Sequence, residues 1–273
     1  MFLQLIEGAE LETKISVITV TYNDLRGLQR TRESVQAQSY LGAEHIIIDG
    51  ASSDGSPAYL QSIASQASVT VRSEPDKGIF DAMNKGLAIA DGDLIVFMNA
   101  GDTFRAPDTL SIVAESYATH RWGWAYGSVQ YVDADGRGKG IIHRQRHRQR
   151  LLELGLTFVP HQTMYVSRAL VDRLGRFDET LSMAADQDYA IRAGRMSNPT
   201  VIPEVLCNFE IGGAHGSLGR IQREMIFHRI RLRNGLLVMR SRNIDRIFAF
   251  ANGARWFARD SVVRMIRGVR PDR

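Results

Sequence analysis

Cysteine is almost absent from this 273-residue chain, in which Cys207 is the single one. A lone thiol excludes an intramolecular disulfide framework and a metal site built from several cysteines, and it suits a reducing compartment.

Long apolar runs are also missing. None approaches the roughly 20 residues of a membrane-spanning helix, and the first residues lack the basic start and apolar core of a signal peptide. We therefore expect a protein that stays in the cytoplasm.

The glycine-rich loops that bind dinucleotides or nucleoside triphosphates are absent as well. Residues 21–23, which follow the first predicted strand, contain no glycine. Their composition argues against the Rossmann and P-loop modes of nucleotide binding. What remains is an ordinary globular composition, with 44% hydrophobic and 23% charged residues. A chain of this length can form one large domain, with or without a small appendage, and bury a full core.

Short apolar segments alternate with helical patterns in the first hundred residues. Strands are expected at 15–21, 44–49, 69–71 and 94–98, and helices after the first strand, near residue 57 and over 79–90. This alternation predicts an α/β fold with a right-handed, doubly wound parallel sheet. Further on, residues 122–132 and the turn at 133–136 predict a hairpin. The second part of the sheet should therefore be mixed.

Acidic side chains stand where the predicted strands end. In open α/β sheets, ligands bind beyond the carboxyl ends of the strands. A carboxylate there can accept from a base or a ribose hydroxyl, or bind a metal that bridges to a diphosphate. For each of these acids, the alternative is that it caps a helix. We accept this interpretation for Asp54. For Asp102 it would require a helix over residues 103–117. The five acids are Asp49, Asp54, Asp76, Asp81 and Asp102.

A second acidic motif, Asp186 and Asp188, stands at the start of a predicted helix. Two residues at this spacing cannot share a helix face, so one should point into a cleft while the other caps or pairs. A helix N-terminus favours the ionised form of a carboxylate, which suits a general base. Plain capping is the alternative. His161 stands beside a further predicted strand, in a position that is by itself more typical of a structural histidine.

These motifs, in this order, resemble the family-two inverting glycosyltransferases of the GT-A fold, and within them the short bacterial enzymes of the colanic-acid transferase type. The resemblance covers about residues 13–215. It implies a GT-A domain over 1–215, with a mostly parallel sheet that becomes mixed, and a basic helical tail over 216–273. The matching segments are SVITVTYN (16–23), IDGASSDGS (48–56), EPDKGIFDAMNKG (74–86), NAGD (99–102) and ADQD (185–188).

The resemblance implies a nucleotide-sugar donor, which in this family is most commonly a UDP-sugar. Thr21, Tyr22 and Asn23 would lie against the nucleotide. Asp49 would accept a hydrogen bond from the base, and Asp76 would lie near the ribose or the diphosphate. These positions define the nucleotide side of the expected cleft.

The resemblance also implies a divalent metal cofactor, Mn²⁺ or Mg²⁺. Residues 99–102 occupy the place of the family's Asp-x-Asp metal motif, but Asn99 stands where the first acid would be. Asp102 is therefore the one direct metal ligand that the resemblance implies. Asp81 and Lys85 would line the same cleft and help to hold the donor.

On the acceptor side, Asp186 aligns with the family's catalytic base, which takes the proton from the acceptor hydroxyl. His161 and Gln162 would shape the acceptor side of the cleft. His215 either approaches the metal or belongs to a loop, and the loop is the safer interpretation.

The end of the chain is strongly basic. Residues 219–273 hold 14 arginines, no lysine and four acidic residues, a net charge of +10 that leaves −6 on the preceding 218 residues. The pattern predicts a basic amphipathic helix on an anionic membrane surface, where a lipid-linked acceptor would be within reach. Packing of its apolar stripe onto the domain is the alternative. Nucleic acid is not expected as a partner, since no aromatic stacking platform accompanies the arginines. The stripe consists of Ile244, Ile247, Phe248, Ala251, Ala254, Phe257, Val262, Met265, Ile266 and Val269.

The sequence thus favours a metal-dependent, inverting glycosyltransferase, peripheral on the inner face of the cell membrane, that acts on a glycan or lipid-linked acceptor in polysaccharide assembly. A nucleotidyltransferase is one rival, but residues 21–23 lack the glycine-rich basic loop that it would need. A non-catalytic module that binds sugar nucleotides or membranes is the other. The presence of both Asp102 and Asp186 argues against it.

Overall fold

The amino-terminal part of the chain forms the parallel half of one sheet. The computed structural model describes residues 13–133, 135–143, 146–211 and 220–266. The strands β1, β2 and β4 are mostly buried, as strands covered on both faces are, whereas β3 lies at the edge of the sheet and is partly exposed. The predicted doubly wound parallel sheet is confirmed. The order is β3-β2-β1-β4, with β1 (Ile15–Thr21), β2 (Ala43–Asp49), β3 (Val69–Ser73) and β4 (Leu94–Phe97).

The register brings the carboxyl ends of these strands to one edge of the sheet. Thr21 at the end of β1 pairs with Asp49 of β2, which in turn pairs with Ser73 of β3. Beyond β4 the chain stays beside β1, because the amide of Ala100 donates to the carbonyl of Val20 at 3.1 Å. The turn after β4 therefore lies at the same edge as the ends of β1 and β2.

The second half of the sheet is mixed. β8 runs antiparallel to β4, β6 antiparallel to β8, and β9 parallel to β6. β5 pairs antiparallel with β9, and β7 with β6, so the predicted hairpin is confirmed. The bounds are β5 (Thr103–Phe104), β6 (Trp124–Val132), β7 (Gly138–Ile142), β8 (Met164–Ser167) and β9 (Thr200–Glu210).

The helix predicted over 103–117 begins later than expected. Its first two residues form β5 against β9, and helix α4 (Thr109–His120) follows with Asp108 as its N-cap residue. Phe104 is buried in the core, so strand pairing prevails over helix propensity at this point. Asp102 does not cap a helix, and that alternative is wrong.

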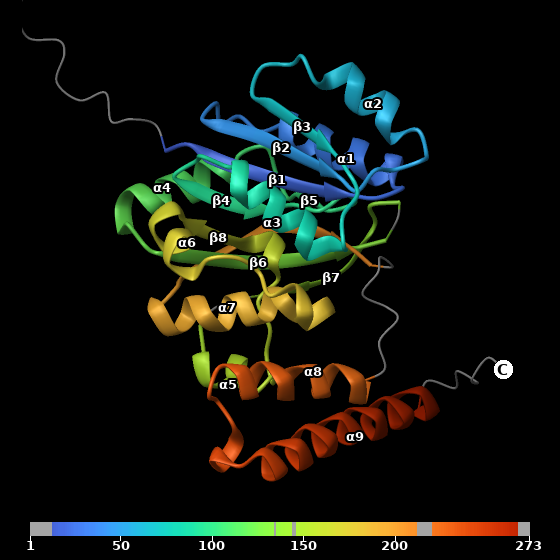
Figure 1. Cartoon of the computed structure of the whole chain (residues 1–273), viewed down its shortest axis with the longest axis vertical. Helices are drawn as coiled ribbons and strands as arrows, with labels where there is room; N and C mark the ends of the chain where they lie inside the picture. The colour runs from blue at the N-terminus through green and yellow to red at the C-terminus, as the bar shows by residue number, and fades with distance from the viewer. Residues whose placement is uncertain (1–12, 134, 144–145, 212–219, 267–273) are drawn as a thin grey trace, which may run out of the picture.

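Helices cover both faces of the sheet (Figure 1). One core cluster joins the sheet to α3, α6 and α7, and two others join its opposite face to α1, α2 and α4. Neighbouring strand residues alternate between the clusters, as the pleat requires. The bounds are α1 (Leu25–Gln36), α2 (Ser56–Ile63), α3 (Ile79–Ile89), α6 (Arg168–Leu174) and α7 (Ala185–Met196).

The C-terminal tail is a pair of helices, α8 (Arg220–Arg233) and α9 (Arg242–Ile266). Figure 1 shows α7, α8 and α9 one after another below the sheet, with α9 outermost. Ile226, Phe227 and Ile230 of α8 belong to the same core cluster as α3 and α7. A division of the chain at residue 215 stays a prediction. Among the described helices, none combines the length and the hydropathy of a membrane span.

The inner face of α9 differs from the predicted apolar stripe. Ala249 and Asp245 are fully buried, whereas Ile247 and Phe250 are 68% and 58% exposed. Ile247 belongs to the predicted stripe, and so does Ile244, which is 40% exposed. Packing of the stripe onto the domain is therefore wrong for Ile244 and Ile247. Members of the stripe from Phe257 onward lie outside the described side chains.

A buried carboxylate fastens α9 to α8. Asp245 accepts from Arg231 Nε and Nη2, at 2.8 and 3.1 Å, and from the Val238 amide at 2.9 Å, and His228 Nδ1 lies 2.6 Å away. Neither the Arg231 nor the Asp245 side chain is exposed. Burial alone would raise the pKa of Asp245, but the bonds from Arg231, Val238 and His228 outweigh it and hold the pKa below its ordinary value.

We expect Asp245→Ala to lower the free energy of unfolding by about 3 kcal/mol, because it leaves the Arg231 guanidinium buried without its partner. Urea denaturation followed by circular dichroism at neutral pH measures the change. Replacing both partners, Asp245→Leu with Arg231→Met, should recover most of the loss. The exposed control Asp135→Ala should change the value by less than about 0.5 kcal/mol. A double variant as unstable as Asp245→Ala would contradict this role of the ion pair.

Candidate active site

Two neighbouring cavities of about 550 Å³ each lie at the carboxyl edge of the sheet. The Asp102 cavity is bounded by the ends of β1 and β9, the turn after β4 and the start of α3. The Asp186 cavity is bounded by the loop 155–160, the short 3-10 helix η1 (His161–Thr163), the start of α7 and α8. Gln162 and Phe209 line both cavities, so the two are adjacent.

Asp102 is a buried carboxylate with two protein donors. Its Oδ2 accepts from Gln162 Nε2 at 2.7 Å, and its Oδ1 accepts from the backbone amide of Glu210 at 3.1 Å. Burial raises the pKa of Asp102 from 3.8 to about 6, although the Gln162 bond and the nearby His161 act in the opposite direction. The folded protein thus holds a carboxylate that it solvates incompletely.

A tight turn directs Asp102 into its cavity. The Asp102 amide donates to the Asn99 carbonyl at 3.0 Å, and Gly101 adopts a φ of +97°, which glycine tolerates best. Thr31 of α1 donates to the Asp102 carbonyl at 2.7 Å and accepts from the Gly101 amide at 3.1 Å. Sequence analysis missed Thr31, because a threonine within a helix carries no signal of a contact so distant along the chain.

His161 connects the two cavities. Its Nε2 lies 3.0 Å from Asn99 Nδ2, and its Nδ1 lies 3.3 Å from Asp186 Oδ2. When Asn99 donates to Nε2, the neutral ring carries its proton on Nδ1 and donates it to Asp186. The next residue, Gln162, holds Asp102, so η1 contacts both acids. The acceptor-side role of His161 and Gln162 stays a prediction. The structure places both residues between Asp102 and Asp186.

The residues around Asp102 form an all-oxygen set. Asn99 Oδ1 is buried without a hydrogen-bond partner among the described residues, and Glu210, whose carboxylate pairs with Arg30, lines the same cavity. Mg²⁺ and Mn²⁺ prefer such ligands. Nowhere in the described ranges do three His, Cys, Asp or Glu residues form a metal-binding group. The set therefore fits an ion that completes its coordination with water and a diphosphate.

Glu210 was not singled out from the sequence, because it stands at the end of a strand whose pairing with the rest of the sheet is not visible in the chain order. His215, considered above as a metal neighbour or a loop residue, lies outside the described residues.

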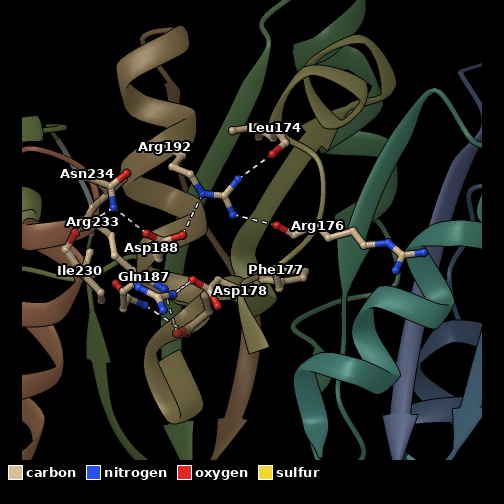
Figure 2. Close-up of polar contacts among 12 residues, drawn as sticks. Leu174, Arg176, Phe177, Asp178, Gln187, Asp188, Arg192, Ile230, Arg233 and Asn234 are labelled. Atoms are coloured by element: carbon tan, nitrogen blue, oxygen red, sulfur yellow. Dashed lines mark hydrogen bonds and ion pairs between the residues drawn. The ribbon is translucent and has the colours of Figure 1, made fainter. Parts of the chain in front are cut away.

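Asp186 and Asp188 leave the start of α7 in different directions. Asp186 is 8% exposed, lines the second cavity and accepts from the Gln187 amide at 2.8 Å. Asp188 accepts from Arg192 Nε at 2.8 Å and from Asn234 Nδ2 at 2.7 Å (Figure 2). One carboxylate faces a cavity and the other is paired, as their spacing predicts.

Polar contacts tie the start of α7 to α8 and to the chain before it (Figure 2). The Arg192 guanidinium that holds Asp188 also donates to the carbonyls of Leu174 and Arg176, at 2.6 and 2.9 Å. Arg233 of α8 forms an ion pair with Asp178. The helix that carries Asp186 is therefore held by the C-terminal tail.

Three of the residues expected on the nucleotide side line the Asp102 cavity, namely Thr21, Tyr22 and Asp76. Tyr22 is 65% exposed, so its ring is open to a ligand. Asp76 accepts from the Gly78 amide at 2.8 Å and lies at the cavity, where a donor would bind.

The other residues expected on the nucleotide side form bonds within the protein and are not among the described residues that line this cavity. Asp49 is fully buried and accepts from the hydroxyls of Ser52 and Ser73, at 2.5 and 2.6 Å. Asp54 accepts from the amides of two helix starts, so for this residue the capping interpretation agrees with the structure. The residues expected on the nucleotide side that do not line the cavity are Asn23, Asp49, Asp81 and Lys85. The donor roles of these four, like those of Thr21, Tyr22 and Asp76, stay predictions.

A sheet that is doubly wound and parallel in its first half and mixed in its second, with helices on both faces, is the arrangement of the GT-A fold. The profile of Glycosyl transferase family 2 matches residues 16–175, and the chain belongs to this family. Family membership confirms the resemblance seen in the sequence. It also decides against the nucleotidyltransferase alternative.

Relatives and solved structures agree with this assignment. An uncharacterised glycosyltransferase of Mycobacterium tuberculosis is 40% identical over 205 residues, which are 73% of this chain and 76% of the relative. A PGL/p-HBAD biosynthesis glycosyltransferase of Mycobacterium bovis is 27% identical over 193 residues, which are 68% of this chain and 71% of that protein.

Two solved structures share the fold at low identity. Staphylococcus aureus TarS 1-349, in complex with UDP-GlcNAc, has a TM-score of 0.68 at 18% identity over 88% of this chain and 72% of its own. The mannosyltransferase PcManGT from Pyrobaculum calidifontis, in complex with GDP-Man and Mn²⁺, has a TM-score of 0.63 at 20% identity over 94% and 81%. These similarities confirm the predicted fold class.

The raised pKa of Asp102 leads to a pH-dependent stability difference. Between pH 3.8 and 6 the folded protein binds a proton that the unfolded chain has released, so this stabilisation is present at low pH and lost as the pH rises through 6. Relative to Asp102→Asn, the free energy of unfolding of the wild type should fall by about 2 to 3 kcal/mol between about pH 4 and pH 7.5. Urea denaturation of both proteins in EDTA measures it. A difference that does not change with pH would contradict the incomplete solvation of this carboxylate.

Proposed function

We propose that the chain is an inverting glycosyltransferase that moves a sugar from a nucleoside-diphosphate donor, a UDP-sugar, to a glycan or lipid-linked acceptor. One observation carries the proposal. The segment η1 contacts Asp102 through Gln162 and Asp186 through His161, so the two acids border adjacent cavities. The TarS complex with UDP-GlcNAc and the PcManGT complex with GDP-Man support the donor class.

Asp186 would act as the general base. The acceptor hydroxyl attacks the anomeric carbon from the side opposite the leaving diphosphate, and Asp186 takes the hydroxyl proton as the new bond forms. The carboxylate is fixed for this step, because its Oδ1 accepts from the Gln187 amide and its Oδ2 lies 3.3 Å from His161 Nδ1. A base held in one orientation loses less freedom when the acceptor binds.

Asp102, Asn99 and Glu210 would hold the divalent metal, Mn²⁺ or Mg²⁺, on the donor side. When bound, such an ion offsets the charge that grows on the departing diphosphate. Asp102 supplies a carboxylate at the cavity, and the unpartnered Asn99 Oδ1 supplies a neutral oxygen where the family motif has an acid. The complex of PcManGT with Mn²⁺ supports the choice of ion.

Replacing the base gives the direct test. Asp186→Asn keeps the shape of the side chain but cannot take a proton, so UDP release from a UDP-sugar in the presence of acceptor should fall at least about 100-fold. The donor comes from a screen of sugar nucleotides with Mn²⁺ for thermal stabilisation, and the acceptor from a comparison of candidate glycosides by the nucleotide that they release from this donor. Asp135→Asn changes an exposed carboxylate that lines neither cavity, so it is the control and should keep the rate within about threefold. Full activity of Asp186→Asn would rule out this base.

The same variants separate binding from chemistry. Calorimetric titration of UDP with Mn²⁺ should give similar affinities for the wild type and Asp186→Asn, because Asp186 borders the other cavity. A wild-type protein that binds no UDP with Mn²⁺ would contradict the donor side of the proposal.

We also propose that the tail places the enzyme on an anionic membrane surface, in keeping with a role in polysaccharide assembly. Ile221 of α8 and Ile247 and Phe250 of α9 are exposed and border one surface groove with Arg246. Apolar side chains beside arginines on one helical face are typical of binding to the interface of an anionic bilayer. The exposed positions of Ile244 and Ile247 support this proposal over packing of the stripe onto the domain.

Vesicle sedimentation tests the membrane surface. The full chain should bind vesicles of phosphatidylcholine with a quarter phosphatidylglycerol, and bind pure phosphatidylcholine at least about tenfold more weakly, because charge attraction adds to apolar burial. Ile247→Ser with Phe250→Ser should weaken binding to the anionic vesicles at least about tenfold. Leu41→Ser, which removes an 89% exposed leucine elsewhere, is the matched control. Equal binding of all three proteins would exclude this face as the membrane contact.

A further inference from the structure

The Asp186 cavity has an apolar wall that a nucleotide-sugar donor does not explain. Its polar end is formed by His161, Gln162 and Asp186. Cavities that bind small molecules commonly combine a few polar groups at the reacting end with apolar side chains elsewhere. The apolar lining consists of Leu156, Phe158, Pro160, Met183, Ile226 and Phe227.

Two of these side chains are partly exposed. Leu156 and Phe158 are 38% and 37% exposed, although both border the cavity. Apolar surface left open beside polar reacting groups is a usual feature of a ligand site. A molecule bound in the cavity would bury Leu156 and Phe158 further.

The loop that carries them is fixed against α8. Arg231 Nη1 donates to the Leu154 carbonyl at 3.2 Å. Gly155 adopts a φ of +72°, and a Cβ atom there would lie 2.8 Å from the Phe227 ring. Because the backbone approaches α8 this closely, Leu156 and Phe158 stay at the cavity instead of joining the core.

The position of Asp186 decides which molecule meets this wall. Gln162 and Phe209 separate the two cavities, and the donor would occupy the one on the Asp102 side. An acceptor whose hydroxyl reaches Asp186 must point its reacting oxygen toward the donor. The remainder of the acceptor then extends away from the donor, along the apolar wall.

The charges around the cavity favour a neutral group. Arg223 and Glu224 of α8 both line it, and they have opposite signs. Glu224 accepts from Asn252 Nδ2 at 2.9 Å, and the charge of Arg223 favours its ionised form. The described lining therefore holds no excess of cations that would select a phosphate in this part of the cavity.

We propose that the Asp186 cavity binds a neutral apolar aglycone, an alkyl or aryl group attached next to the acceptor hydroxyl. This proposal rests on the proposed function, because Asp186 defines where the hydroxyl lies. It adds the chemical class of the acceptor: a glycan presented without an apolar group would leave Leu156 and Phe158 uncovered and bind more weakly.

The test uses N-phenyl-1-naphthylamine, a neutral apolar probe whose fluorescence rises on binding. The full chain should bind it saturably, and octyl β-glucoside below its micelle-forming concentration should displace it at least about tenfold more effectively than methyl β-glucoside. Leu156→Ser with Phe158→Ser should weaken probe binding at least about tenfold. Leu41→Ser, a matched change of an exposed leucine outside the cavity, should not change it. Circular dichroism melting of each variant shows whether it is folded.

Three outcomes would overturn the proposal. They are equal displacement by the two glucosides, unchanged probe binding in the folded double variant, and loss of probe binding in Ile247→Ser instead, which would locate the apolar site on the tail. Titration of UDP with Mn²⁺ on the same wild-type sample separates the two proposals. UDP binding without probe binding would overturn the aglycone site alone, whereas absence of UDP binding would contradict the donor site.

Discussion

The burial of the Asp102 carboxylate is the constraint on which the candidate site depends. A charge removed from water is costly unless protein groups replace the solvent. Gln162 and the Glu210 amide do so here, at 2.7 and 3.1 Å. Since Gln162 follows His161, which contacts Asp186, the position of one acid fixes the end of β9, η1 and the start of α7. The geometry of the whole edge follows from these few bonds.

The compensation at Asp102 is incomplete, as its pKa of about 6 indicates. A neutral side chain at this position would make the folded protein more stable, so the charged carboxylate is retained at a cost in stability. Such conflicts are expected where a site is arranged for a ligand and not for the fold alone. The unpartnered Oδ1 of Asn99, on the same turn, is a second conflict of this kind. A cation at the cavity would relieve both.

The basic tail is part of this arrangement, because α8 packs into the core that contains α7. Arg233 at the end of α8 pairs with Asp178, and Asn234, the residue after α8, donates to Asp188. Asp178 and Asp188 lie on either side of Asp186 in the chain. In addition, α8 forms one wall of the Asp186 cavity, while α9 presents Ile247 and Phe250 outward. The surface that we assign to the membrane and the cavity that we assign to the acceptor thus share one helix pair.

The sequence by itself determined the parallel half of the sheet, the hairpin and the family, because apolar period and short motifs are local properties of the chain. It also identified Asp102 and Asp186 and the divergence of Asp186 from Asp188. Only the tertiary structure decided that residues 103 and 104 form a strand, that Thr31 and Glu210 join the site, and that His161 lies between the acids. Each of these depends on pairing between segments far apart in the chain, and a linear pattern contains no record of which distant backbone groups will meet.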